Sequence, residues 1–470
     1  MHEPIRLTRL SFLVVFTLSL LVGLVGCVTA PSPDELINPS AVPNGPPTIR
    51  TPNGSLSEKQ SRAVIDRLQS QVPSTDILQR HLAQAEELTG APLVAGNKVT
   101  LLTDGPITYA AIFQAIEAAQ DHINLETYIF ADDDLGERLA AALSRKQAEG
   151  VQVNIIYDAV GSLTTPETFF ATLKGRGIQI LKFNPVNPLE NPGIRSVNQR
   201  DHRKILIVDG KVAFTGGVNI TSAYSRSAFR KPKRKEVDIE NSAWRDTHIR
   251  IEGPAVTGLQ KLFMGTWQRQ NGPALSPRNY FPALTTQGDH IARVIGSTSS
   301  DKEFDVYKIL LSAIQNADNY IHITNAYFIP DKHLLTAIKQ AADRGVEIKM
   351  VLPSYTDSGA VFHAGRSHYT TLLESGIKIY ERRHALLHAK TMVIDGVWST
   401  VGSANLDMRS FFHNDEVNVV ILGSQFAGEM EALFQKDLQD SDEVSLEQWE
   451  QRPLWQRLKE GASRLFEYWM

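Results

Sequence analysis

Two short segments of the chain carry the same residues at the same spacing, and these residues are suited to acid–base or nucleophilic chemistry. Residues 202–210 read HRKILIVDG and residues 388–396 read HAKTMVIDG, 186 positions apart. Side chains at i and i+2 of a strand point to one face, so we expect an imidazole and an ammonium group to share a surface in each copy. Near neutral pH, imidazole can serve either as a nucleophile or as a proton donor.

The duplication extends beyond the histidine and the lysine. The aspartates of the motifs, Asp209 and Asp395, precede glycines, and these pairs predict tight turns. The returning strands end in GGVN and GSAN, so Asn219 and Asn405 are also 186 positions apart. A single His–Lys pair is most often a surface pair. Packing makes apolar periodicity repeat but does not make polar identities repeat, so two matching copies indicate a functional site.

The elements around the motifs also occur twice. AIEAAQDHINLETYIF (115–130) matches AIQNADNYIHITNAYFI (313–329), and in both an amphipathic helix precedes an apolar strand. Further helix–strand pairs follow at residues 135–158 and 333–353, and at residues 173–185 and 372–383. Alternating helices and strands predict an α/β fold, a mixed sheet covered by helices on both faces and built twice. A repeat of roughly 190 residues is a duplicated domain rather than a solenoid.

The N-terminus resembles a bacterial lipoprotein signal at residues 1–26. Arg6 and Arg9 precede an apolar run that ends just before Cys27, which is the only cysteine. The run of about 16 residues is short for a membrane span of roughly 20, although a plain membrane anchor is an alternative. Cleavage would leave Cys27 lipidated and the chain in the cell envelope, on the non-cytoplasmic, periplasmic side. Val28 after the cysteine favours the outer membrane over the inner one.

The remaining boundaries follow from composition and periodicity. We predict a flexible tether at 27–57, a helical lead-in at 58–88, a first domain at 89–285, a second domain at 286–442 and an amphipathic tail at 443–470. The tryptophan-rich tail suits a membrane interface, and packing onto the domain is the alternative. The first half also carries an insertion with a basic cluster at 230–235, either a solvated loop or a contact for anionic lipid headgroups.

The duplicated H-x-K-x4-D and G-G/S-x-N motifs resemble those of the phospholipase D superfamily. NLETYIFADDDLG, YDAVGS, WRDTHIRIEGPAV and GSANLDMRSFFHNDEVNV resemble its bacterial cardiolipin synthase branch, and the resemblance runs from about residue 88 to the C-terminus. Members of that branch usually begin with hydrophobic membrane helices, whereas this chain begins with a lipoprotein signal. The resemblance implies two tandem phospholipase D-like α-β-α sandwich domains related by a pseudo-twofold axis, with one active site at their interface.

The resemblance also implies roles for the motif residues. His202 is the nucleophile that forms a phosphohistidine, and His388 is the acid that protonates the leaving group; symmetry alone would allow the reverse. The non-bridging phosphate oxygens are held by Lys204, Lys390, Asn219 and Asn405. These lysines take the place of a metal ion, so we expect no metal and no other cofactor.

The aspartates of the motifs are poorly placed to contact the histidines. Asp209 lies at the turn, about 20 Å along an extended strand from His202. On the next strand, the aligned repeats place Asp246 opposite Glu416. We predict that these two carboxylates orient the histidines, and that Asp209 and Asp395 are mainly structural.

The expected reaction passes a phosphatidyl group from His202 to an alcohol. A second phosphatidylglycerol as acceptor gives cardiolipin and glycerol, whereas water as acceptor makes the protein a phospholipase D that releases phosphatidic acid. A nuclease is the alternative, but the net charge of −4 and the pI near 6.4 argue against a nucleic-acid partner. A noncatalytic binding module is a third reading, against which stands the presence of every motif residue. The expected partners are an anionic glycerophospholipid and a membrane surface, and no obligate protein partner is inferred.

Overall fold

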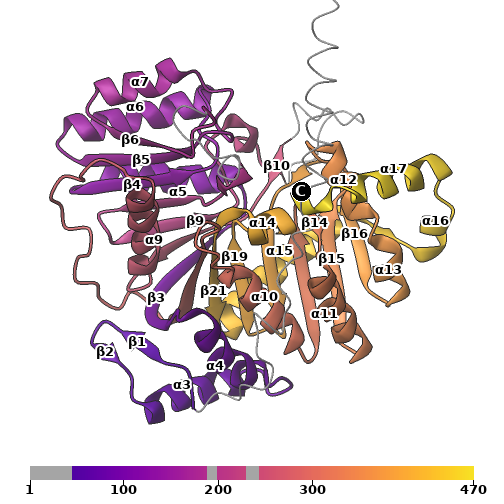
Figure 1. Ribbon diagram of the computed structural model, residues 1–470. Coiled ribbons are helices and arrows are strands. Elements are labelled where there is room, and N and C mark those ends of the chain that lie inside the picture. The colour runs from indigo at the N-terminus through magenta and orange to yellow at the C-terminus, as the bar shows by residue number, and fades with distance from the viewer. Residues whose placement is uncertain (1–44, 188–197, 229–242) are drawn as a thin grey trace, which may run out of the picture.

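The computed structural model describes residues 45–187, 198–228 and 243–470, and most of these form two lobes of similar construction (Figure 1). In each lobe helices cover a mixed sheet on both faces, which confirms the predicted duplicated α/β fold. The predicted signal at 1–26, Cys27 and the basic cluster at 230–235 lie outside the described residues.

The first half contains a seven-strand run with helices on either side. In spatial order the strands are β6 (Gln179–Phe183), β5 (Gln152–Asp158), β4 (His122–Thr127), β8 (Ile205–Val208), β9 (Val212–Gly216), β11 (His248–Glu252) and β3 (Leu93–Leu102). One face packs against α5 (Gly105–Ala118), α6 (Asp134–Ala148) and α7 (Glu167–Gly175), and the other against α9 (Val256–Arg269). The helix–strand pairs expected from the repeat are therefore present.

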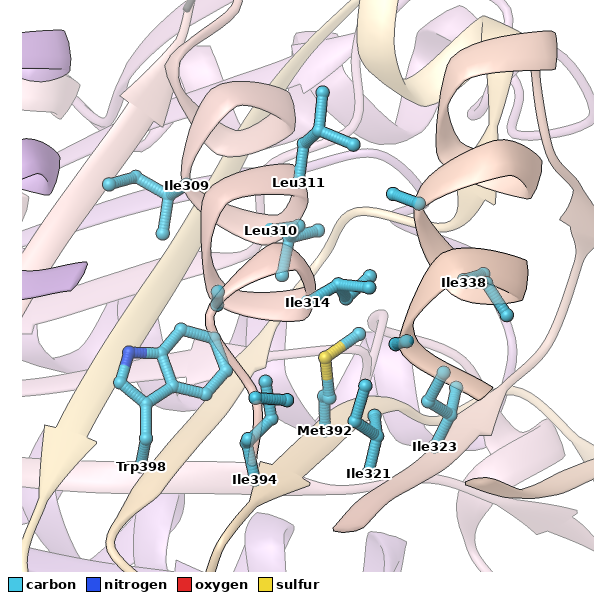
Figure 2. Packing of buried hydrophobic residues seen from close by; sticks show 14 of the residues in the cluster. Ile309, Leu310, Leu311, Ile314, Ile321, Ile323, Ile338, Met392, Ile394 and Trp398 are labelled. Carbon is cyan, nitrogen blue, oxygen red and sulfur yellow. The ribbon is translucent and has the colours of Figure 1, made fainter. Parts of the chain in front are cut away.

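The second half repeats this order. Its strands are β16 (Lys378–Arg382), β15 (Glu347–Pro353), β13 (Tyr320–Asn325), β18 (Lys390–Ile394), β19 (Trp398–Gly402), β21 (Asn414–Leu422) and β12 (His290–Ser297). The helices are α10 (Asp305–Gln315), α11 (Lys332–Asp343) and α13 (Tyr369–Glu374) on one face and α15 (Ser424–Gln439) on the other. Figure 2 shows Met392, Ile394 and Trp398 of the sheet meeting Ile314 of α10, with Ile338 of α11 beside them.

In the described residues, strand pairing joins the two halves at three places. The antiparallel pairing of β3 with β12 makes the two sheets continuous. The short strand β7 (Arg200–Asp201) of the first half pairs with β21 of the second. Conversely, β17 (Leu386–Leu387) of the second half pairs with β10 (Trp244–Arg245) of the first. Each half therefore sends a short strand onto the other, and both of these strands end directly before a motif histidine.

The segment ahead of the first half differs from the prediction. The tether was expected to reach residue 57, but β1 (Ile49–Thr51) and β2 (Gly54–Ser55) form a hairpin, and β1 pairs with β3. Ile49 is fully buried and Pro47 is also buried, and the proline and asparagine residues around them show no strand periodicity. The lead-in is two helices, α3 (Glu58–Ser70) and α4 (Ile77–Thr89), because Pro73 lies in the break between them. Helix α4 packs against α10 of the second half.

Short elements complete the second half and the predicted tail. They are β14 (Phe328–Ile329), α12 (Gly359–Arg366), β20 (Leu406–Asp407), α14 (Met408–Phe412), β22 (Ser441–Val444), α16 (Leu446–Glu450), α17 (Leu454–Arg464) and η2 (Glu467–Trp469). Strand β22 pairs with β16, so the tail begins as part of the sheet. Within the ranges that the structure describes, none of the helices combines the length and apolar character needed to cross a bilayer.

Candidate active site

The two motif histidines lie where the chain passes from one half to the other. His202 follows β7, and its backbone N–H donates to the carbonyl of Asp415 at 2.9 Å. His388 follows β17, and its N–H donates to the carbonyl of Arg245 at 2.8 Å. The strand argument placed histidine and lysine inside one strand, but β8 begins only at Ile205 and β18 at Lys390. The reason is that the chain around each histidine pairs with the opposite half before it enters its own sheet.

Each imidazole contacts a carboxylate from the other half of the chain. Nδ1 of His202 lies 3.0 Å and 3.1 Å from the two carboxylate oxygens of Glu416. Nδ1 of His388 lies 2.7 Å from Oδ2 of Asp246. The structure thus brings Asp246 and Glu416 to the histidines, and it adds the crossing, which the sequence did not predict. A carboxylate at Nδ1 holds the proton there and leaves a lone pair on Nε2 for chemistry.

Burial sets the charge states of these pairs. It lowers the pKa of His202 to about 4, although the charge of Glu416 opposes the shift. Burial acts in the opposite direction on Glu416, but the imidazole of His202 and the charge of Lys204 outweigh it and lower the pKa to about 2. The pKa of His388 is also lowered, first by burial and then by Lys390. At neutral pH the site therefore holds neutral imidazoles beside anionic carboxylates, which suits a nucleophilic nitrogen.

The two motif lysines are buried next to the histidines. Nζ of Lys204 donates to the carbonyl of His202 at 2.6 Å, and Nζ of Lys390 donates to that of His388. An ammonium group has three N–H donors, so these contacts leave donors for the oxygens of a substrate. Burial lowers the pKa of Lys204 to about 7 and that of Lys390 to about 8. A phosphodiester anion between them would stabilise their charged forms.

The two half-sites act on each other electrostatically. The charge of Lys390 lowers the pKa of His202, and the charge of Lys204 lowers that of His388. The charge of Lys390 also lowers the pKa of Lys204. With the crossed carboxylates, these couplings make one site from residues of both halves, in which the two lysine side chains can donate to a phosphate anion.

The motif asparagines occupy different surroundings. The amide of Asn219 accepts from the N–H of Ile129 at 3.3 Å and donates to the hydroxyl of Tyr224 at 3.4 Å. Oδ1 of Asn405 is buried without a hydrogen-bond partner. In the described structure Asn219 therefore positions a neighbouring side chain, while Asn405 retains hydrogen-bonding capacity for a substrate.

The motif aspartates lie at the far ends of their strands. Asp209 and Asp395 each occupy the left-handed region with φ of 53°, as the first residues of the two hairpin turns. The carboxylate of Asp209 accepts backbone N–H groups of Gln120, Asp121 and His122. Asp395 does the same with residues 318–320. Both carboxylates thus tie a turn to the start of the neighbouring strand, at the opposite end of β8 or β18 from the motif histidine.

Comparison with known proteins shows the family of the chain. A family model described as cardiolipin synthase, PLD-like domain, matches residues 112–230 and 310–438. The chain belongs to the cardiolipin synthase family. Similar curated proteins include the cardiolipin synthases of Listeria monocytogenes serotype 4b, 38% identical over 80% of this chain and 76% of the relative, and of Halalkalibacterium halodurans, 35% identical over 81% and 74%.

A solved structure supports the fold. Phosphatidylserine synthase of Haemophilus influenzae superposes with a TM-score of 0.60, at 14% identity, covering 82% of this chain and 99% of that one. The family model and the curated relatives confirm the predicted membership of the phospholipase D superfamily, in its cardiolipin synthase branch. The chain is a phospholipase D-type enzyme of the cardiolipin synthase family.

Aromatic residues that the sequence argument did not single out surround the histidines of this family member. The hydroxyl of Tyr224 lies 3.0 Å from Nδ1 of His388, beside Asp246. The ring of Tyr128 lies 5.1 Å from that of His202 and 5.3 Å from Nζ of Lys204. The only available signal was that the repeated segments 115–130 and 313–329 both retain a tyrosine after the apolar strand.

Buried arginines beside the two histidine–carboxylate pairs connect the two halves of the fold. Arg203 donates to the carbonyl of Ser297 at 2.6 Å and to that of Glu416 at 3.2 Å. Arg245, the neighbour of Asp246, makes a two-pronged ion pair with Asp437 at 2.9 Å and 2.7 Å. These contacts hold the crossing strands in register. In the described ranges, no group of three or more histidine, cysteine, aspartate and glutamate side chains is arranged to hold a metal ion.

Proposed function

We propose that this protein makes cardiolipin and glycerol from two phosphatidylglycerol molecules through a phosphohistidine on His202. The observation that carries this proposal is the crossed arrangement, in which each of two imidazoles is held at Nδ1 by a carboxylate of the opposite half. Displacement at phosphorus needs a nucleophile on one side and a proton donor on the other. Family membership supports the choice of a phosphatidyl group as the group transferred.

The first step forms a bond between Nε2 of His202 and phosphorus. The bond from phosphorus to the glycerol oxygen breaks, and that oxygen takes a proton from His388. Negative charge on the substrate raises the pKa of His388 and so supplies the protonated form. In the second step the hydroxyl of another phosphatidylglycerol gives its proton to His388 and attacks phosphorus, and the bond to His202 breaks. Lys204 and Lys390 stabilise charge on the non-bridging oxygens in both steps.

Incubation of the purified protein with phosphatidylglycerol labelled in its acyl chains tests the proposal. We expect labelled cardiolipin and an equal amount of free glycerol, and loss of both in His202→Ala. Phosphatidic acid as the main product would make water the acceptor and the protein a hydrolase. No lipid product, with cleavage of an oligonucleotide instead, would favour the nuclease alternative.

We also propose that Cys27 is lipidated and that the enzyme faces the periplasmic side of the envelope. The arginine-flanked apolar run and the small residue before Cys27 support this placement. Labelling of cells with a radioactive fatty acid should mark the protein, and Cys27→Ser should remove the mark. Fractionation of the envelope would then distinguish the outer from the inner membrane.

A further inference from the structure

The C-terminal helix α17 presents a row of large apolar side chains to solvent. They are Leu454 (75% exposed), Trp455 (54%), Leu458 (74%), Leu465 (82%) and Phe466 (42%). At 100° per residue these positions fall within an arc of about 120°, so they form one continuous apolar face. The face extends past the helix end because Leu465, its C-cap, keeps helical dihedral angles.

The opposite side of α17 is fixed to the protein, so this face does not turn inward. Glu460 is 3% exposed and accepts from Arg452 at 3.0 Å. The guanidinium of Arg452 lies 4.2 Å from the ring of Trp449, which is itself buried and donates to Thr370 at 3.0 Å. The predicted tail thus has two parts: Trp449 packs onto the domain, whereas the apolar face of α17 is exposed to solvent.

Three cationic side chains lie beside the apolar face, and one of them, Arg464, is paired with Glu467 at 3.6 Å. Arg457, Lys459 and Arg464 are exposed along its margins, and Nζ of Lys459 lies 4.7 Å from the ring of Trp455. The one acidic residue of α17, Glu460, is on the buried side. The whole chain carries a net charge of −4, so this cationic margin is a local feature. An apolar face between cationic margins matches the interface of an anionic phospholipid bilayer.

Helix α17 is also connected to the candidate active site through packing. It packs against α12, and α12 packs against β14, at the end of the second half where β10 also lies (Figure 1). The residue before β14 is Tyr327, whose ring lies 6.3 Å from that of His388. On the other side, the carbonyl of Met470 accepts from the N–H of Arg409 in α14, directly after the Asn405 motif.

We propose that α17 is an interfacial helix that seats the second half on an anionic phospholipid bilayer, with the side of the molecule that carries His388 toward the lipid. This inference rests on the proposed function for its lipid class. Docking through α17 would place the site next to its substrate without a membrane-spanning segment in the described ranges.

Site-specific fluorescence tests the docking. In the full chain with Cys27→Ser, a single cysteine at Leu458→Cys carries an environment-sensitive label, and Arg62→Cys on α3 serves as the matched control. With phosphatidylglycerol vesicles we expect a blue shift and quenching by bromine-substituted lipid at position 458 and neither at position 62. Equal behaviour at both positions, or burial of the label only when a second protein is added, would overturn the proposal.

Substitutions separate the apolar and electrostatic contributions. Each of Leu458→Ser and Leu465→Ser should weaken vesicle binding on the order of tenfold, since each removes an exposed leucine from the lipid contact. Arg457→Gln and Arg464→Gln should each weaken binding to phosphatidylglycerol vesicles about fivefold and leave binding to phosphatidylcholine vesicles unchanged. Equal binding by all four variants and the parent would overturn the proposal.

Activity on two substrate forms separates this inference from the proposed function. The leucine variants should lose transfer on vesicles but keep it on monomeric short-chain phosphatidylglycerol, which needs no docking. Insertion of the label at position 458 with no transfer on either form would refute the function and leave the docking intact. Full transfer on vesicles by variants that no longer bind them would refute the docking alone.

Discussion

Glu416 contacts Nδ1 of His202 through both of its carboxylate oxygens, at 3.0 Å and 3.1 Å, although 214 positions separate the two residues. Asp246 and His388 repeat the contact in the opposite direction, 142 positions apart. Neither motif histidine takes its carboxylate partner from its own half. Separation of the halves would therefore leave two incomplete sites.

Removal of either crossed carboxylate should reduce turnover sharply while the protein remains folded. In Glu416→Gln the amide no longer stabilises charge on His202, and we expect kcat to fall by about 10²- to 10⁴-fold. Rates of cardiolipin formation and of phosphohistidine accumulation check this prediction. The kcat of Asp246→Asn should fall by a similar factor. Near-normal turnover in both variants would show that the carboxylates do not orient the histidines.

The roles of the two histidines can be separated by the leaving group of the substrate. With a phosphatidyl ester of p-nitrophenol, whose leaving group needs no proton, the first release of p-nitrophenol by His388→Ala should recover much of the roughly 10²- to 10⁴-fold that general acid catalysis typically supplies. Later turnovers should stay slow, because the acceptor hydroxyl still lacks its base. His202→Ala should be inactive on both this ester and phosphatidylglycerol, because the nucleophile itself is missing. Recovery in His202→Ala instead would reverse the assignment of nucleophile and acid.

Substitution of the motif aspartates should change stability rather than chemistry. Asp209→Asn keeps a side chain that tolerates positive φ but weakens the acceptor for three backbone N–H groups, so we expect a loss of about 1–3 kcal/mol of unfolding free energy. Urea unfolding measures the loss, and turnover per folded molecule should remain that of the parent. A fall in turnover as deep as that of His202→Ala would make Asp209 part of the catalytic machinery.

Stability should depend on pH through His202. Its folded-state pKa is lowered to about 4 from an ordinary 6.5, so the unfolded chain binds more protons between these values. The contribution of His202 to the free energy of unfolding is complete above about pH 6.5. It is lost as the pH falls toward 4, with a slope of up to about 1.4 kcal/mol per pH unit.

The matched variant for this experiment is His202→Gln. Burial also lowers the pKa of His81 and His248, to about 3 in each, so the informative quantity is the difference in slope between parent and variant. Urea unfolding between pH 4.5 and 7.5 should give the shallower dependence for His202→Gln. Equal slopes would show that the burial of His202 does not lower its pKa.

The duplicated fold was predictable because it depends on local periodicity. The helix–strand pairs at 135–158 and 333–353 became α6–β5 and α11–β15, since amphipathic spacing and the glycines after the helices are encoded in adjacent residues. The hairpin at Ile49 was missed because the few buried residues of this proline-rich segment, Pro47 and Ile49, show no recognisable strand periodicity.

The site was predictable in composition but not in connection. Identical offsets singled out the histidines and lysines, and strand length directed attention away from Asp209 toward Asp246 and Glu416. The exchange of carboxylates between the halves could not be predicted from the sequence. It depends on the pairing of β7 with β21 and of β10 with β17. Strands β7, β10 and β17 have only two residues each, which is too short for a recognisable sequence pattern. Tyr224 was missed for the same reason, since it reaches His388 only through the tertiary fold.

Helices α3 and α4 pack on the half of the molecule that is more distant from them in the sequence. They precede the first half, yet Ile77, Leu78 and Leu82 join the core of the second, and Thr75 hydrogen bonds Asp395 at 2.7 Å. If the gene were split at the boundary between the halves, α3 and α4 would be made as part of the first half, although they pack on the second. The second half produced alone would expose the apolar surface that α3 and α4 cover, which would make it a target for chaperones and proteases. It would need residues 45–89 supplied as a separate polypeptide to fold into a soluble domain.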